Sequence, residues 1–203
     1  MNILYLASKS QSRKTLLTKA GIPFELLEQD ADEAQCDWTL PLAAVVESIA
    51  RFKMEQVIGP HKQEGTIIFV LTADTLSVDN TGKIRGKPTD LDHAVAMIKA
   101  ARGPNNVCGT AFCLDKKIMK NGGWHTQQRI IGYAQATYHI DIPDAMIEDY
   151  IKKADALNGA GAIKIEDGAQ FVKSIQGSYT AIIGLPMFEL RQALQEIGFY
   201  SER

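Results

Sequence analysis

The chain has 203 residues, of which 45% are hydrophobic, and it carries a formal net charge of −2. This length and apolar fraction can build one sizeable core or two small lobes that share a sheet. The slightly negative charge argues against nonspecific nucleic-acid binding, which needs a surplus of basic residues. No stretch of the sequence approaches the ~20 apolar residues of a membrane span.

The three cysteines, Cys36, Cys108 and Cys113, cannot all pair within the chain, and their spacing is not that of a metal site. Buried free thiols in a reducing cytosol are therefore expected. The apolar run at the N-terminus is too short for a signal peptide. These features predict a soluble, cytoplasmic protein without a membrane partner.

Strands and helices alternate in the first half of the sequence. Strands are expected over residues 2–7, 22–27 and 66–72, the last continuing through 76–78, and helices from the Ser/Lys loop to residue 20 and over 41–58. The second half is expected to hold helices over 89–101, 143–154 and 186–197, two β-rich runs over 107–117 and 127–142, and short strands near Ala162 and Phe171. This order indicates an α/β fold, a mixed twisted sheet flanked by helices, with a central cleft between two lobes.

The first predicted helix carries a charge on its buried face. Arg13 lies three and four residues before Leu16 and Leu17, so it shares their side of the helix. Ser8 and Ser10 occupy the loop at the helix N-terminus, where free N–H groups favour an anion. Serine is also the usual helix cap at this place. The neighbouring arginine favours a phosphate site.

The second predicted helix repeats this feature. Its apolar stripe is formed by Leu42, Val45, Val46 and Ile49, and the same face continues to Lys53. A lysine in such a stripe can extend its ammonium group out to solvent. The alternative is an ammonium group held in a cleft, where it meets an anion or positions a carboxylate.

Two groups of carboxylates could complete a phosphate site. Asp74 ends the central strand between "FVLTA" and "TLSV", while Asp30, Asp32 and Glu33 lie in the acidic loop "EQDADEAQCD", which could also be simply solvated. Carboxylates at a cleft are hard ligands of the kind that Mg²⁺ binds. Lys87 follows in "GKP", which is not a P-loop because the spaced glycine and the Ser/Thr are missing. A metal-bound phosphate needs both signs of charge nearby.

In order and over nearly the whole chain, these motifs resemble those of the Maf family of nucleoside triphosphate pyrophosphatases. They are "LASKSQSRKTLLTKAGIPFE", "DADE", "IARFK", "ADT", "GKP", "AGAIKIEDGA" and "GSYTAIIGLP". The resemblance implies one Maf-like domain over residues 1–203, two lobes sharing one sheet, related to inosine triphosphate pyrophosphatase folds. It implies an enzyme that hydrolyses a nucleoside triphosphate to the monophosphate and pyrophosphate with Mg²⁺ or Mn²⁺. A non-catalytic, nucleotide-binding regulator of cell division is the alternative, because the family is linked with septum formation.

The same resemblance assigns roles to individual residues. Its substrate-binding residues are Ser8, Ser10, Arg13, Thr75, Lys164 and Glu166, and its catalytic residues are Glu33, Lys53, Asp74 and Lys87. Asp74 would orient or deprotonate the attacking water, and Glu33 and Asp74 would hold the metal. Lys53 and Lys87 would stabilise charge on the phosphoryl oxygens.

The sequence also departs from the family pattern. Gln11 and Ser12 stand where the family commonly has Pro and Arg, and Asn106 lies near a family His. Lys164 and Glu166 resemble the subgroup that acts on 7-methyl-GTP, because a carboxylate can accept from guanine N1–H and the 2-amino group. A surface ion pair between the two is the structural alternative. The preferred base, pyrimidine or modified purine, and a homodimer stay open.

Overall fold

The computed structural model describes residues 2–200 of the chain. These residues form two compact units, each assembled from separate stretches of sequence. Within the described residues, unit 1 takes the chain up to Asp74, Ala111–Tyr133 and the chain from Gly184, whereas unit 2 takes Thr75–Thr110 and Ala134–Ile183. Each unit has its own hydrophobic core.

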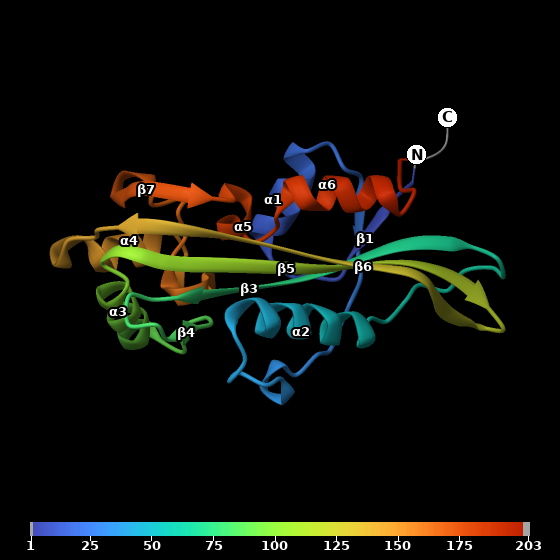
Figure 1. The fold of residues 1–203 in the computed structure, drawn as a ribbon, viewed down its shortest axis with the longest axis horizontal. Helices are drawn as coiled ribbons and strands as arrows, with labels where there is room; N and C mark the ends of the chain where they lie inside the picture. The colour runs from blue at the N-terminus through green and yellow to red at the C-terminus, as the bar shows by residue number, and fades with distance from the viewer. Residues whose placement is uncertain (1, 201–203) are drawn as a thin grey trace. The chain divides into compact units, whose positions relative to one another are not determined.

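In the described part of the chain, seven strands form one mixed sheet flanked by helices (Figure 1), as predicted. The strands are β1 (Leu4–Leu6), β2 (Phe24–Leu26), β3 (Ile67–Val78), β4 (Ile84–Arg85), β5 (Gly103–Lys120), β6 (Gly123–Ile140) and β7 (Val172–Gly177). Their order is β2-β1-β3-β5-β6-β7, with β4 paired to β3. β1 runs parallel to β2 and β3, while the β3–β4 and β6–β7 pairs are antiparallel.

Five of the six α-helices in the described part of the chain follow the predicted order, and α5 (Tyr179–Ile183) was not predicted. The other five are α1 (Gln11–Lys19), α2 (Leu42–Glu55), α3 (Leu91–Ala100), α4 (Ile147–Lys153) and α6 (Met187–Glu196). Short 3₁₀ turns are η1 (Glu33–Gln35), η2 (Asp144–Met146), η3 (Ala156–Asn158), η4 (Ala160–Ala162) and η5 (Ala169–Phe171). No helix among the described residues has the length and apolarity needed to cross a bilayer.

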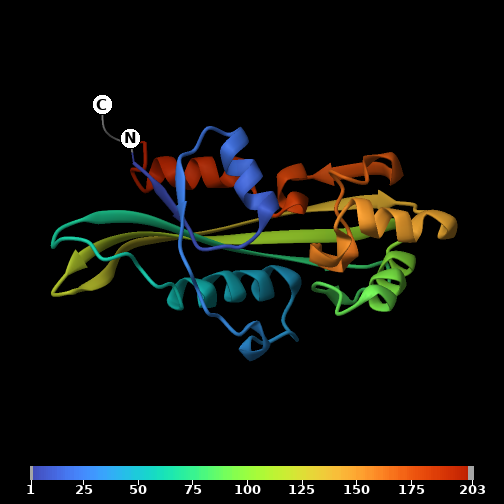
Figure 2. The ribbon, with the colours of Figure 1, turned by 180° about the vertical axis from the view of Figure 1, so that it is seen from behind.

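In unit 1, α1 and α6 lie on one face of the sheet and α2 lies on the other (Figures 1 and 2). Alternate residues of β3, Phe69, Leu71 and Ala73, belong to the core under α1 and α6. The residues between them point the opposite way, because side chains alternate along a strand. Thr72 accordingly donates to the Ala50 carbonyl of α2 at 2.6 Å. The same alternation turns Asp74, two residues further on, toward α2.

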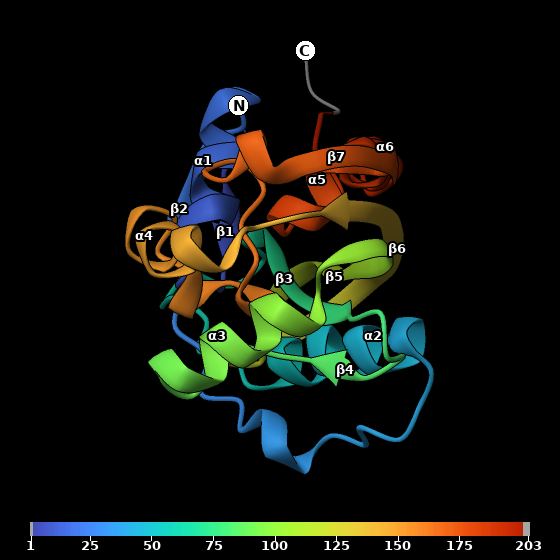
Figure 3. The ribbon, with the colours of Figure 1, turned by 90° about the vertical axis from the view of Figure 1, so that its left-hand side faces the viewer.

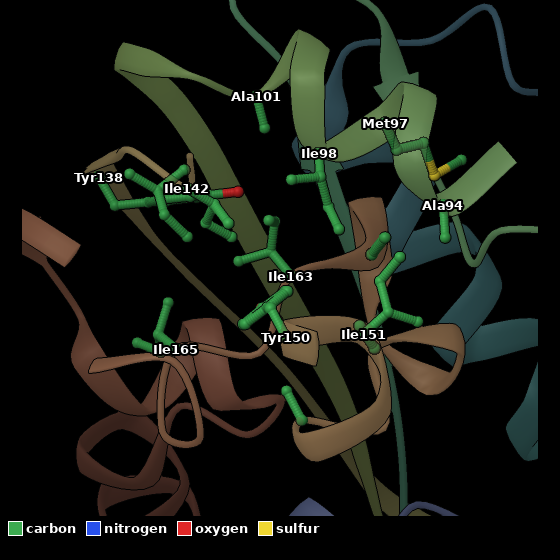
Figure 4. Close-up of a cluster of buried hydrophobic side chains, with 14 of the residues drawn as sticks. Ala94, Met97, Ile98, Ala101, Tyr138, Ile142, Tyr150, Ile151, Ile163 and Ile165 are labelled. Atoms are coloured by element: carbon green, nitrogen blue, oxygen red, sulfur yellow. The ribbon is translucent and has the colours of Figure 1, made fainter. Parts of the chain in front are cut away.

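The core of unit 2 gathers side chains from α3, α4, the end of β6 and the turns after α4. Figure 4 shows Ile98 of α3, Tyr150 and Ile151 of α4, and Ile163 directed toward one another. Figure 3 shows α3 and α4 near each other in this unit, and the two helices are in contact. This packing holds the loops that carry the predicted substrate-binding residues of unit 2.

A fully buried carboxylate links β5 and β6 in unit 1. Arg129 Nε and Nη2 donate to the two oxygens of Asp115 at 2.7 and 2.8 Å, and Thr126 donates at 3.0 Å. Arg129 also bonds Glu55 at the end of α2. Such a bidentate pair satisfies the buried charge that would otherwise be costly. The network therefore connects α2 to the β5–β6 ribbon.

Two local predictions were wrong. The central strand runs without interruption over β3, and no strand forms around Ala162, which lies in the 3₁₀ turn η4. Gly161 and Ala162 have φ values of +65° and +59°, a left-handed conformation that is incompatible with a strand. Lys164 and Glu166 therefore do not share one side of a strand. The three cysteines are free, as predicted, with Cys108 and Cys113 buried and Cys36 half-buried.

Candidate active site

Lys53 is the centre of the candidate site in unit 1. Its Nζ lies 2.6 Å from Glu33 Oε1 and 2.7 Å from Asp74 Oδ1. The Lys53 side chain is 9% exposed and that of Asp74 is 7% exposed, whereas Glu33 is 43% exposed. The ammonium group of Lys53 is therefore almost completely buried and lies between the two carboxylates. Helical spacing on α2 and alternation along β3 place Lys53 and Asp74 together.

The second oxygen of Asp74 has no hydrogen-bond partner among the described residues. Asp74 Oδ2 is buried, and no donor reaches it. An unsatisfied buried polar atom costs about 1–3 kcal/mol, and more for a charged group. Such atoms in native proteins call for a water, an ion or a functional role. Asp74 is thus held through one oxygen by Lys53, while the other oxygen has unused acceptor capacity.

The acidic loop is ordered around Glu33 by contacts that the sequence did not indicate. Asp32 caps the 3₁₀ turn η1 by accepting from Ala34 N at 3.1 Å. The indole Nε1 of Trp38 donates to the Glu33 carbonyl oxygen at 3.2 Å. Asp30 is exposed to solvent, as expected if the acidic loop is simply solvated at this position. Glu33 differs from it because its carboxylate meets Lys53.

The serine and arginine residues before and within α1 form a second cluster in unit 1. Arg13 is 8% exposed; its Nε donates to the Gly184 carbonyl at 2.8 Å and its Nη1 to Ser8 Oγ at 3.0 Å. Ser10 is the N-cap of α1 and accepts from Arg13 N. Burial lowers the pKa of Arg13, while the charges of Asp74 and Glu33 act in the opposite direction. The guanidinium thus lies in the field of the two carboxylates.

Two predicted residues of unit 2, Lys164 and Lys87, lie near Asp155. Lys164 Nζ lies 3.2 Å from Asp155 Oδ2. Asp155 has φ +48° and accepts from the side chain of Asn158 through both oxygens. Hydrogen bonds from Asn158 and Lys164, together with the charge of Lys87, lower the pKa of Asp155. Asp155 therefore brings two predicted cationic residues into one neighbourhood, although the sequence did not single it out.

Two further buried polar residues, Asn106 and Thr110, form hydrogen bonds within unit 2. Asn106, which stands near the family His, donates from Nδ2 to the carbonyl oxygens of Ala101 and Gly103 at 2.6 and 3.0 Å. These bonds fix the connection from α3 to β5. Thr75 Oγ1 lies 2.8 Å from Thr110 Oγ1. No sequence pattern indicated Thr110, because its hydrogen bonds are made to other elements of the fold.

The fold and the site define an α/β protein with a buried ammonium group between two carboxylates and a serine–arginine cluster in the same unit, an arrangement suited to an anionic ligand. The family model described as "Maf-like protein" matches residues 3–197. The chain belongs to the Maf family.

Curated relatives align with almost the full chain. A protein of Hydrogenovibrio crunogenus is 32% identical over 201 residues, covering 98% of each chain. A protein of Nitrosomonas europaea is 34% identical over 207 residues, covering 97% of this chain and 95% of the relative. One of Caldicellulosiruptor bescii is 30% identical over 201 residues, covering 98% and 96%. All three carry the name dTTP/UTP pyrophosphatase.

Proposed function

We propose that this protein is a nucleoside triphosphate pyrophosphatase that hydrolyses dTTP and UTP to the monophosphate and pyrophosphate. The observation that carries the proposal is the pairing of Lys53 with Glu33 and Asp74, in which Asp74 Oδ2 has no partner among the described residues. Hydrolysis of a phosphoric anhydride needs a positioned acceptor for a proton of water and cations for the phosphoryl oxygens. The name shared by the full-length relatives supports the same activity.

In the proposed reaction, water attacks the α-phosphorus and the bond from that phosphorus to the bridging oxygen of the β-phosphate breaks. Asp74 Oδ2 accepts a proton of the attacking water, and pyrophosphate leaves with the bridging oxygen. Lys53 holds Asp74 through Oδ1 and so keeps Oδ2 oriented. Arg13 and Ser8 supply donors for phosphate oxygens, because Ser8 Oγ accepts from Arg13 and retains its own hydroxyl hydrogen.

Glu33 and Asp74 fit a divalent metal ion, Mg²⁺ or Mn²⁺. Both offer carboxylate oxygens, which are hard ligands, and the unpartnered Oδ2 of Asp74 is the kind of atom that an ion satisfies. The described residues contain no group of three or more His, Cys, Asp or Glu able to hold a metal. A site with two carboxylates agrees with Mg²⁺, which completes its shell with water and substrate phosphates. When bound, the ion would neutralise charge on the triphosphate.

We propose that the enzyme prefers pyrimidine nucleotides to 7-methyl-GTP, which the sequence had suggested. The relatives with that name align over almost their whole length with this chain. Lys164 pairs with Asp155 and lies outside any strand, so the strand geometry expected for an ion pair between Lys164 and Glu166 is absent. We further propose a cytoplasmic location, where nucleotide pools are found; homodimer formation stays a prediction.

The test is a substrate panel with purified protein and Mg²⁺: dTTP, UTP, CTP, 7-methyl-GTP and inosine triphosphate. Pyrophosphate and the monophosphate are expected in equal amounts from dTTP and UTP. Direct release of orthophosphate without pyrophosphate would mean a phosphatase. Nucleotide binding without turnover over hours would favour the regulator.

The Asp74→Asn variant tests whether Asp74 takes part in catalysis as well as in nucleotide binding. The amide cannot take a proton from water, so kcat is expected to fall by about 10²–10⁴-fold with an unchanged circular dichroism spectrum. Asp30→Asn is the matched control, because Asp30 is exposed in the acidic loop; it should leave kcat unaltered. Ordinary turnover by Asp74→Asn would remove Asp74 from the mechanism.

A further inference from the structure

The hydroxyl group of Tyr150 holds the backbone of Lys164 at two points in unit 2. It accepts a hydrogen bond from Lys164 N at 2.7 Å and donates one to the Lys164 carbonyl oxygen at 3.2 Å. The directions are fixed, because an N–H group only donates and a carbonyl oxygen only accepts. Lys164 lies outside the helices and strands of the described chain. One tyrosine side chain therefore takes the place of the backbone partners that a helix or strand would supply.

The ring of Tyr150 is itself held in the core of unit 2. Tyr150 is 3% exposed, lies beside Ile163 (Figure 4) and packs edge to face against Phe171, with 5.8 Å between the ring centroids. Gly168 permits this placement, because a Cβ atom there would lie 2.5 Å from Tyr150 Cε2. Burial raises the pKa of the Tyr150 hydroxyl, so the hydrogen that it donates to Lys164 is retained at neutral pH. The hydroxyl is thus a fixed point against which Lys164 is placed.

The other end of Lys164 is also held. Its Nζ lies 3.2 Å from Asp155 Oδ2, and the Lys164 side chain is only 17% exposed. The Asp155 carboxylate in turn accepts from Asn158 Nδ2 at 2.9 and 3.0 Å. An ammonium group has three hydrogens, and the bond to Asp155 uses one of them. Lys164 is therefore a fixed cation with further hydrogens to donate.

A second predicted cation belongs to the same neighbourhood. Gly161 N donates to the Gly86 carbonyl oxygen at 2.8 Å. This bond ties the turn before Lys164 to the residue before Lys87. The charge of Lys87 acts on Asp155 together with that of Lys164. Around Asp155, two ammonium groups thus accompany one carboxylate, and this surplus of positive charge favours an anion over a neutral acceptor such as a base carbonyl oxygen.

We propose that Tyr150 is a positioning residue that holds Lys164 for binding the phosphate groups of the substrate. The inference rests on the proposed function, which supplies a triphosphate. Phosphate oxygens are ionised acceptors, and hydrogen bonds between charged groups are roughly twice as strong as neutral ones. A lysine has a long, flexible side chain, so holding it before the anion arrives reduces the entropy lost on binding. Tyr150 therefore acts through Lys164 and not through a contact of its own with the phosphate.

The experiment measures Kd for inorganic pyrophosphate by calorimetry on the full chain. Pyrophosphate has the phosphate chemistry without a base, a sugar or the bond that the proposed reaction breaks. Lys164→Met should weaken its binding about tenfold, and Tyr150→Phe about threefold. In the Lys164→Met background, Tyr150→Phe should have no further effect, because the residue through which it acts is gone. A purely structural role of the hydroxyl would persist in that background.

Tyr138→Phe is the matched control. Tyr138 is 2% exposed in the same core, and its hydroxyl bonds the side chain of Ser77. Its loss should lower Tm and leave the Kd for pyrophosphate unchanged. Thermal melting establishes that each variant is folded at the temperature of the measurement, which can be lowered for Tyr150→Phe. If Tyr138→Phe weakened pyrophosphate binding as much as Tyr150→Phe, a general loss of stability would explain both, and the proposal would be wrong.

Unchanged pyrophosphate binding by Lys164→Met would also overturn the proposal. A loss confined to dTTP would place Lys164 at the nucleoside and would contradict it, as would independent effects of the two substitutions. Pyrophosphate binding that depends on Lys164, without hydrolysis of any nucleoside triphosphate, would refute the proposed function alone.

Discussion

At the scale of single residues, Lys53 and Asp74 depend on each other because neither side chain is more than a tenth exposed. Removing one partner of a buried pair leaves the other charge uncompensated, which typically costs about 3–5 kcal/mol. Lys53→Met should therefore lower the free energy of unfolding by about that amount, measured by urea denaturation. The loss arises from Asp74, whose other oxygen already has no partner among the described residues.

Arg51→Met is the matched control for this experiment. Arg51 lies on the same helix but is exposed, and surface substitutions usually change stability by less than about 0.5 kcal/mol. If Lys53→Met were as mild as Arg51→Met, the ion pair would not be a structural requirement. Lys53 would then matter only for the ligand.

At the scale of elements, substitutions at the start of α1 can separate helix capping from the proposed phosphate binding. Ser10 is the N-cap of this helix, and an N-cap Ser→Ala change typically costs about 1 kcal/mol. Ser10→Asp retains a capping oxygen and favours the helix dipole, so stability should be kept. If the loop also binds phosphate, the new negative charge should weaken dTTP binding. Urea denaturation and calorimetry measure the two effects independently, and tight dTTP binding by Ser10→Asp would limit Ser10 to the cap.

The turn between β3 and β4 should make stability depend on pH. Asp79 is 5% exposed and accepts from the backbone and hydroxyl of Thr81, from Lys83 N and from Arg85 Nε. Burial alone would raise the pKa of Asp79, but these hydrogen bonds outweigh it and the pKa is lowered. A group with a lowered folded pKa adds stability above its unfolded pKa of about 3.9. That stability is lost as the pH falls through the folded pKa.

Asp79→Asn should therefore be less stable than the wild type by about 1–2 kcal/mol at pH 7, and the difference should shrink below about pH 4. Denaturation curves from pH 7 to pH 3 test this expectation. Asp30→Asn, at an exposed position, should follow the wild-type profile throughout. A constant difference between Asp79→Asn and the wild type would show that the carboxylate charge is unimportant.

The sequence predicted the elements whose patterns are local and periodic. The stripe of α2 placed Lys53 on a buried face, and the apolar run of β3 ending in Asp74 marked a central strand. The prediction of a strand around Ala162 was wrong, because the left-handed turn there places a non-glycine residue at positive φ. Thr110 and Asp155 were also missed. Their significance depends on Ala181 and Lys164, which are distant in sequence or come from another element.

At the scale of the whole molecule, ligand binding should raise stability. A ligand that binds only the folded state adds about 2.7 kcal/mol at 100 times its Kd. Asp74→Asn is suited to this measurement because it should bind dTTP and turn it over slowly. If Glu33 and the triphosphate share a metal ion, EDTA should reduce the increase in Tm, whereas an unchanged increase would remove the metal from binding. Glu33→Gln should likewise reduce the effect of Mg²⁺.

The division of the chain into units that are discontinuous in sequence has a consequence for synthesis. The core of unit 1 combines Leu4 and Leu6 of β1 with Leu190 and Leu194 of α6. On a ribosome, the nascent N-terminal strand is made long before its C-terminal packing partners emerge. We therefore expect unit 1 to complete its core only after α6 has left the ribosome, and truncations that lack α6 to expose apolar surface to chaperones.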